Sequence, residues 1–438
     1  MKRWLLLTSL CLVAVTAARA EVTGGEIDAA GAALEPRVID WRRDFHRHPE
    51  LGNREFRTSG IVAEHLRSLG LEVKTGIAHT GVVAVLRGTL PGPTIMLRAD
   101  MDALPVTELT DVPFRSTATA EFRGRQVGVM HACGHDAHTA ILMGVAEILA
   151  GLRERLPGTV MFVFQPAEEG VPEGEQGGAP LMMQEGLFDI TKPAAIFGLH
   201  VISTLHSGAV GVRSGPFMAG SDFFRIVVIG RQSHGARPWA GIDPIVTAAQ
   251  IINSLQTIVS RQTDITAFPA VLTIGAINGG VRHNIIAETV EMLGTLRTFT
   301  PAIRQEIIDR MQRVVIHVAE ANGATATLEM MPAPNPVVDN DPALTRKVAA
   351  SLEAAFGGDA VKALDTQTVA EDFSYYSREA PSVYYWVGIT PPGQNLRTAP
   401  DNHSDKFFVD ESGIAVGLKS LLHVAVDYLQ DADHSNGP

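Results

Sequence analysis

The chain has 438 residues, a length that corresponds to about two or three domains. Apolar residues make up 45% of the chain and charged residues 19%, which excludes a mainly disordered protein, because disorder requires low hydrophobicity. Acidic residues outnumber Lys and Arg by 48 to 36 without a long basic run, so the composition argues against a nucleic-acid-binding protein. With 15 histidines and two cysteines, any metal site would use mainly imidazole and carboxylate ligands.

The first 20 residues have the pattern of a secretory signal peptide. Two basic residues precede an apolar, uncharged stretch over residues 4–18, and Ala18 and Ala20 are small residues at the positions that precede a cleavage site. We expect cleavage before Glu21 and a periplasmic or secreted mature protein. An uncleaved membrane anchor is the alternative, but the stretch is short for a membrane span, and we expect no membrane association after cleavage.

Cleavage would remove Cys11 and leave Cys133 as the single cysteine of the mature chain, which excludes an internal disulfide. A buried packing thiol is the ordinary interpretation of such a cysteine before its neighbours are considered.

Apolar spacing predicts alternating helices and strands in the first half of the chain. Residues 36–69 fit a helix interrupted near residues 48–52, and residues 137–149 fit a second helix. Short apolar runs predict strands over residues 82–87, 94–97, 159–164 and 194–199. Strands that alternate with helices are typical of a layered α/β domain.

Residues 213–330 predict a second unit inserted into the first. The expected order is β-α-β-β-α-β, which is the ferredoxin-like order, with strands over 223–229, 271–277, 289–298 and 325–330 and helices over 243–259 and 301–322. A proline-rich linker over 332–342 returns to the first unit, which ends in a helix over 411–429. We therefore predict a layered α/β domain with an inserted α+β domain, divided into residues 1–20, 21–212, 213–330 and 331–438.

The densest group of candidate metal ligands is the segment Met-His-Ala-Cys-Gly-His-Asp-Ala-His over residues 130–138. Cys133 and His135 are two positions apart, so in an extended segment their side chains point to one side. A thiolate beside an imidazole suits zinc or another divalent transition metal better than calcium or magnesium. A helix cap with incidental histidines is the alternative, and the density of ligand residues favours the metal.

A pair of adjacent glutamates, Glu168 and Glu169, follows the strand predicted over 159–164. Their side chains can face different partners, so one carboxylate can bind a metal while the other moves a proton. Metal-assisted hydrolysis needs both roles. Two solvated loop acids are the alternative, which the position after a buried strand and beside a metal-type segment disfavours.

Other polar residues also follow predicted strands. His200 closes the strand over 194–199, and His403 lies in a late polar loop; alone, each would be interpreted as a structural residue. Asp100 follows the strand over 94–97 and is a candidate for orienting a metal-bound histidine, while Asp102 is equally a candidate cap for the next turn.

Six motifs follow one another along the chain: LRADMDALP, MHACGHDAH, QPAEEG, GLHV, SHGARP and PDNHSD. Together and in this order they resemble the two-metal amidohydrolase and metallocarboxypeptidase family. That family includes hippurate hydrolases, auxin-conjugate (indoleacetyl-amino acid) hydrolases and N-acyl-amino-acid carboxypeptidases. The resemblance spans residues 40–428. It implies a metal-binding catalytic domain and an inserted lid that mediates dimerisation. It also implies two divalent metal ions per subunit, with zinc, manganese, cobalt and nickel all open.

The resemblance also implies roles for residues within these motifs. Glu168 would be the general base, and His234 in SHGARP would contact the substrate and stabilise the oxyanion, with a surface turn as the alternative for His234. Arg98 stands where many members of the wider superfamily have a histidine; because Arg cannot be a ligand, the ligand set must differ here. The implied metal ligands are Cys133, His135, Glu169, His200 and His403.

Three residues of the predicted inserted unit are candidate substrate contacts. Arg297 can hold a substrate carboxylate through its bidentate fork, although a salt bridge within its strand is the alternative. Asn278, in an Asn-Gly-Gly sequence, and Asn284 are further candidates.

The residues and the resemblance together predict a metal-dependent amidohydrolase that cleaves small N-acyl-amino acids into an acid and an amino acid. The resemblance also implies a homodimer. A dipeptidase or carboxypeptidase is the alternative, because a dipeptide has the same terminal carboxylate. A non-catalytic carboxylate-binding relative would have lost Glu168, Glu169 or His403, and all three are present. A zinc-stabilised structural protein would have closely spaced ligands, whereas these extend from residue 133 to residue 403.

Overall fold

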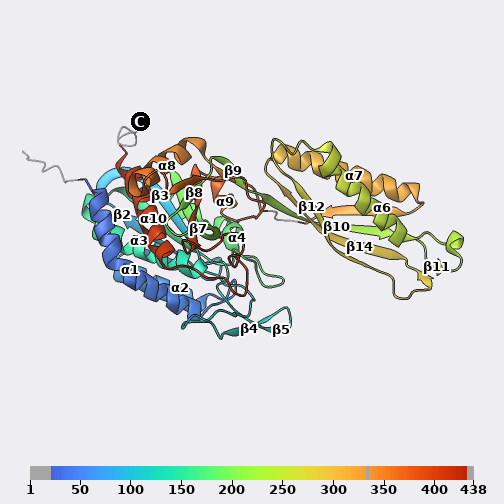
Figure 1. The fold of residues 1–438 in the computed structure, drawn as a ribbon, viewed down its shortest axis with the longest axis horizontal. Helices are drawn as coiled ribbons and strands as arrows, with labels where there is room; N and C mark the ends of the chain where they lie inside the picture. The colour runs from blue at the N-terminus through green and yellow to red at the C-terminus, as the bar shows by residue number, and fades with distance from the viewer. Residues whose placement is uncertain (1–20, 332–334, 432–438) are drawn as a thin grey trace, which may run out of the picture.

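The structure is a computed structural model that describes residues 21–331 and 335–431, so the predicted signal peptide lies outside the described residues. The chain forms two units that lie end to end along the longest axis of the molecule (Figure 1). The first unit contains both ends of the described chain, and the inserted unit consists of residues 220–330.

An eight-stranded sheet forms the centre of the first unit, in the order β1-β2-β6-β3-β7-β18-β8-β17. The central strands β6, β3, β7 and β18 are parallel, so their carboxyl ends lie at one edge of the sheet. The bounds are β1 Glu72–Ile77, β2 Gly81–Arg87, β3 Leu90–Asp100, β6 Pro157–Gln165, β7 Ala195–His206, β8 Val210–Val212, β17 Val361–Ala363 and β18 Ser382–Thr390.

Both faces of this sheet are covered by helices, which makes three layers. Alternate residues of β2 show the two faces: Val82 and Ala84 belong to one apolar core, and Val83 and Val85 belong to the other. The larger core packs against α1 Gly24–Arg47, α2 Phe56–Ser68, α3 His135–Gly151, α8 Pro342–Phe356 and α10 Ser412–Gln430. The smaller core packs against α4 Gly178–Gln184, α5 Leu187–Ile190 and α9 Ser374–Ser377. The predicted α/β class is therefore confirmed.

Helix α10 is strongly apolar because it packs in the core of the first unit. Among the described helices it alone is long and apolar enough to cross a membrane, yet 67% of the apolar stretch is buried inside the protein.

The first helix differs from its prediction. Helix α1 begins at Gly24 rather than near residue 36, because Thr23 and Glu26 form a capping box that fixes this earlier start. Pro36 therefore lies inside the helix. Proline usually marks a helix boundary, and here the packing of α1 against α3 and α10 outweighs that local signal.

The inserted unit has a four-stranded antiparallel sheet in the order β12-β14-β10-β15, with α6 and α7 packed on one face. Along the chain these elements follow the order β-α-β-β-α-β: β10 Gly220–Ile229, α6 Pro244–Thr257, β12 Val271–Gly279, β14 Thr289–Thr298, α7 Pro301–Ala321 and β15 Thr325–Met330. The other face of the sheet is open and exposes Phe223, Ile229 and Leu293. A small pair, β11 Ser233–His234 and β13 Ile285–Ile286, lies at the end of this unit farthest from the first unit (Figure 1).

Candidate active site

The predicted metal ligands meet where the central parallel strands end. β3 leads to Asp100 and Asp102, β6 leads to the paired glutamates, and β7 contains His200. The carboxyl edge of a parallel sheet is where ligands bind in such folds.

Residues with a positive φ lie in the two main ligand segments, next to His135 and next to the paired glutamates. Gly134 precedes α3 with a φ of +94°, and an added Cβ there would lie 2.2 Å from Val201 Cγ2, so only glycine fits. Ala167 precedes the paired glutamates with a φ of +53°, and its N–H donates a hydrogen bond of 2.9 Å to Glu55. This turn is strained for a residue other than glycine, a feature that is common at functional sites.

The five predicted ligands converge around the Cys133 thiol. Its Sγ lies 3.3 Å from Nε2 of His200 and 3.3 Å from Nε2 of His403. His403 Nε2 lies 3.1 Å from Oε1 of Glu169, and His135 Nε2 lies 3.9 Å from that same oxygen. Donor atoms of Cys133, His135 and His200 lie within 4.8 Å of one another, as do those of Cys133, Glu169 and His403.

The donor atoms fit a metal site. Nε2 of His135 is fully buried, yet it has no hydrogen-bond partner among the described residues, as expected for a nitrogen that faces a cation. Burial disfavours the His135 imidazolium, but Asp100, Asp102 and Glu169 outweigh burial and raise the pKa of His135 to about 10. The negative charge of these three carboxylates around His135 favours a cation at this position. One thiol, three imidazoles and a carboxylate are suitable ligands for zinc or a related divalent ion.

Asp102, rather than Asp100, orients the candidate ligand His135. Oδ1 of Asp102 lies 3.2 Å from Nδ1 of His135, and its Oδ2 accepts a hydrogen bond of 2.9 Å from the Glu169 N–H. Asp102 thus contacts two candidate ligands at once, whereas the sequence analysis gave Asp100 as the candidate for this role and a turn cap for Asp102.

Asp100 instead contacts His138 at 2.6 Å through Nδ1 of the imidazole. The other ring nitrogen of His138 accepts a hydrogen bond of 2.9 Å from the Val201 N–H. Because both nitrogens of His138 are engaged, the third histidine of the 130–138 segment is a structural residue.

Glu168 and Glu169 have opposite surroundings. Burial and the neighbouring acids Glu371 and Asp372 raise the pKa of Glu168 well above its usual range. Burial also disfavours the Glu169 carboxylate, but His403 and His135 outweigh it and lower the pKa of Glu169. The Glu168 carboxyl group therefore has a higher affinity for protons than its neighbour Glu169.

Sequence reasoning missed a buried ionic cluster beside Glu168. The guanidinium of Arg98 contacts three carboxylates, Asp100 at 2.6 Å, Glu371 at 2.9 Å and Asp372 at 2.9 Å. Gln165 also accepts a hydrogen bond of 2.9 Å from Arg98. Two adjacent acids between apolar residues at 369–373 were the available signal for this cluster.

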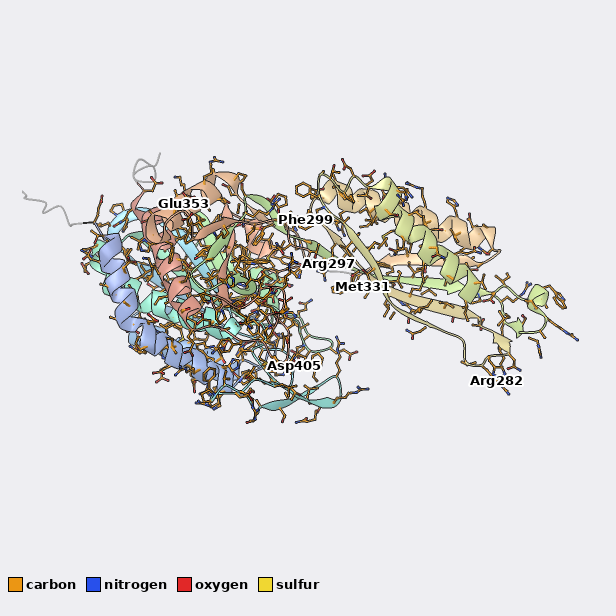
Figure 2. The ribbon with its side chains drawn as sticks, in the orientation of Figure 1. Arg282, Arg297, Phe299, Met331, Glu353 and Asp405 are labelled. Carbon is orange, nitrogen blue, oxygen red and sulfur yellow. The ribbon has the colours of Figure 1, made fainter. Side chains whose placement is uncertain are left out.

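A cleft of about 300 Å³ links the metal-type cluster to the inserted unit. It is lined by Glu168, Glu169 and His403 from the first unit and by Phe223 and Arg297 from the inserted unit. Figure 2 shows Arg297 at the end of the inserted unit that faces the first unit. Burial lowers the pKa of Arg297, against the opposing effect of Asp222, and no described residue forms an ion pair with its guanidinium.

The other candidate contacts do not line this cleft. His234, on β11, is exposed, and its Nδ1 accepts a hydrogen bond of 3.0 Å from the Ala236 N–H. Asn284 lies against the same loop, where its backbone carbonyl accepts a hydrogen bond from the Gly235 N–H. Asn278 is exposed on β12 opposite Glu291. Within one chain, the structure therefore brings Arg297 to the site but not His234, Asn278 or Asn284.

Comparison with known proteins identifies the family. The model of peptidase family M20/M25/M40 matches residues 96–427. The chain is 38% identical to thermostable carboxypeptidase 2 of Saccharolobus solfataricus, over 90% of this chain and 96% of that protein. It is 36% identical to the N-acetyl-L-cysteine deacetylase of Bacillus subtilis, over 92% and 91% of the two chains.

A solved structure agrees with this assignment. The YXEP protein of Bacillus subtilis, described as a dinuclear metal binding peptidase from the M20 family, superposes with a TM-score of 0.75 at 34% identity, covering 91% of this chain and 99% of that one. The family match covers most of the chain, including the paired glutamates and the ligand segment described above. The chain therefore belongs to peptidase family M20/M25/M40.

Proposed function

We propose that the chain hydrolyses N-acyl-amino acids to a carboxylic acid and a free amino acid, using two divalent metal ions held by Cys133, His135, Glu169, His200 and His403. As a family member it is a metal-dependent hydrolase of amide bonds. The observation that supports the substrate class is that Glu168 and an unpaired Arg297 line the same cleft. Their arrangement suits an amide that lies near a terminal carboxylate.

Glu168 and Arg297 have separate roles in the proposed hydrolysis. Bound divalent ions supply Lewis acidity, which lowers the pKa of water and polarises a carbonyl group. Glu168 takes the proton of the attacking water and later delivers it to the leaving nitrogen, so the amide and water become an acid and an amine. Arg297 holds the substrate carboxylate through two parallel hydrogen bonds.

A hydrolysis panel tests this proposal. Metal-reconstituted protein is assayed with acetyl, benzoyl and indoleacetyl conjugates of one amino acid and with the matching dipeptides. We expect the acyl conjugates to be cleaved faster than the dipeptides. Similarity to a carboxypeptidase favours the dipeptidase as the second candidate, and faster cleavage of the dipeptides would establish it instead.

We further propose a homodimer in which His234 enters the partner's cleft and stabilises the oxyanion of the tetrahedral intermediate. The support is positional: His234 is exposed on β11, at the end of the inserted unit far from its own cleft (Figure 1). In this arrangement the inserted unit would serve as the lid and the dimer contact.

Mixed dimers test the role of His234. The His234→Ala and Glu168→Ala homodimers should both be nearly inactive, the former with its metals retained. After subunit exchange, one cleft of each mixed dimer combines an intact Glu168 with an intact His234 from the partner, so activity should return. Exchange that is confirmed by tag pull-down but restores no activity would contradict the shared site.

We also propose that the protein is exported and begins at Glu21, on the basis of the signal-peptide pattern in its sequence. N-terminal sequencing of the exported form should give Glu21 as the first residue. Met1 at the start of that form would contradict cleavage.

A further inference from the structure

We propose that a second cavity beside the metal-type cluster binds a large, uncharged, apolar acyl group. This inference rests on the proposed function, because it identifies the acyl part of the substrate. The cavity has a volume of about 1000 Å³ and is distinct from the cleft of about 300 Å³ that contains Arg297. Glu169 is the one lining residue that the two cavities share.

The shared residue determines how a substrate would lie. Its amide must be near Glu168 and Glu169, and its carboxylate points toward Arg297 in the smaller cleft. The acyl group then extends past Glu169, which is where the larger cavity begins.

Apolar side chains from separate parts of the chain line this second cavity. Val171 follows β6, Leu293 lies on the open face of β14, and Met331 follows β15; they are 38%, 42% and 43% exposed. Leu104 and Phe122, from the first unit, complete the apolar wall. Exposed apolar residues that gather from distant segments mark a binding surface. Figure 2 shows Met331, like Arg297, at the end of the inserted unit that faces the first unit.

The charges at the rim favour an uncharged acyl group. Arg54 is held by Glu175 at 2.5 Å, and the guanidinium of Arg123 lies 5.2 Å from the ring centre of Phe122. Glu121 and Glu173 are exposed acids on the same rim. Because Arg54 is paired with an acid and the rim has two further acids against one further cation, the cavity offers no excess positive charge to an acyl group that ends in a second carboxylate.

The volume favours a large acyl group over acetyl. Cavities of about 300–1,000 Å³ accommodate drug-sized ligands. An acetyl group would leave most of this cavity to water, whereas a medium-chain or aryl acyl group would cover Leu104, Phe122 and Val171.

The test compares acyl groups on one amino acid. Metal-loaded protein is assayed with N-acetyl-, N-butanoyl-, N-octanoyl- and N-benzoyl-alanine. Each methylene that leaves water contributes about a fourfold gain in affinity. If about half of the six additional methylenes are buried, kcat/KM for the octanoyl substrate should exceed that for the acetyl substrate by roughly 50-fold.

Two variants test whether this cavity is responsible. Val171→Trp narrows it and should lower the octanoyl-to-acetyl ratio at least about tenfold, and Leu293→Gln should also lower that ratio. Leu90→Trp is the matched control: Leu90 is 36% exposed at the opposite end of β3, and the ratio should not change. Calorimetry on the Glu168→Gln protein, which should bind without turnover, should show tighter binding of the octanoyl than of the acetyl compound.

The outcomes separate the two proposals. If none of the four substrates is cleaved or bound, the proposed function fails and this inference fails with it. If kcat/KM for the acetyl substrate equals that for the octanoyl substrate, the proposed function stands and the acyl cavity is refuted. If octanoyl is preferred but Val171→Trp and Leu293→Gln leave the ratio unchanged, the acyl group binds elsewhere and the inference is also refuted.

Discussion

Arg98 is the residue whose replacement should reveal most about how the site is held together. Its side chain is 0% exposed and contacts the carboxylates of Asp100, Glu371 and Asp372 at 2.6–2.9 Å. Arg98→Met keeps much of the side-chain volume but removes the one guanidinium in this cluster. Removing one partner of a buried ion pair costs about 3–5 kcal/mol, because the remaining charges are left buried without compensation.

The loss should depend on pH in a defined direction. Burial and the neighbouring Glu371 raise the pKa of Asp372 to about 8 in spite of Arg98. Without the guanidinium, the pKa of Asp100, which now lies well below its usual range, should rise, and that of Asp372 should rise further. A carboxyl group with a raised pKa in the folded state binds more protons there than in the unfolded chain, so stability falls as pH rises. The deficit of Arg98→Met should therefore be smaller at pH 5 than at pH 8.

Urea unfolding of the metal-free protein, followed by circular dichroism, measures this loss without a contribution from metal binding. Arg87→Met is the matched control, because Arg87 also lies on a strand but is 56% exposed in its pair with Glu72. That variant should lose at most about 1 kcal/mol, with little dependence on pH. A deficit of Arg98→Met that equals the control, or that does not change between pH 5 and pH 8, would refute the reasoning.

Three further predictions concern the metal-type cluster and are measured as metal content and turnover. Glu168→Gln should retain metal while turnover falls about 10²–10⁴-fold, whereas Glu169→Gln should lose metal as well; swapped results would reverse the two assignments. Cys133→Ser should lose metal and activity together, because a hydroxyl is a weaker ligand for a soft ion than a thiolate, and unchanged metal content would make Cys133 a packing residue. Asp102→Asn should lower metal affinity about 10–100-fold by releasing His135, while the exposed control Asp111→Asn should leave it unchanged.

The parts of the site that could be predicted from sequence are those with a local signal. Cys133 and His135 lie two positions apart, and Glu168 and Glu169 lie just beyond the end of a buried strand. The structure brings these residues together with His200 and His403, because the parallel strands end at one edge of the sheet. A short motif beside a strand end thus contains enough information to locate most of the cluster.

The missed features depend on contacts between distant segments. Arg98 and Glu371 are 273 positions apart, and neither has a local pattern that indicates its partner. Asp100 and Asp102 both follow the same strand, so the sequence could not distinguish which would reach His135. That choice depends on where α3 begins relative to β3, which is a property of tertiary packing.

For His234, sequence and structure give complementary information. The motif around it indicates a functional histidine, but it does not indicate which cleft the side chain serves. In the structure the side chain is exposed on β11 and does not line the cleft of its own chain. The motif therefore indicates the residue type, and the mixed-dimer experiment tests which cleft His234 serves.

The two adjacent glutamates show how one sheet edge can produce two different carboxyl groups. Glu169 faces the imidazoles of His403 and His135, which favour its ionised form. Glu168 faces Glu371 and Asp372, which disfavour ionisation. Paired acids whose surroundings push their pKa values apart have separate roles in acid–base chemistry. Arg98 binds both of the acids that face Glu168. These carboxylates can therefore stay buried near the proposed base, because the one guanidinium offsets part of the free energy needed to bury their charge. An arginine at this position, which cannot bind a metal, is thus consistent with a site that needs a compensating charge rather than another ligand.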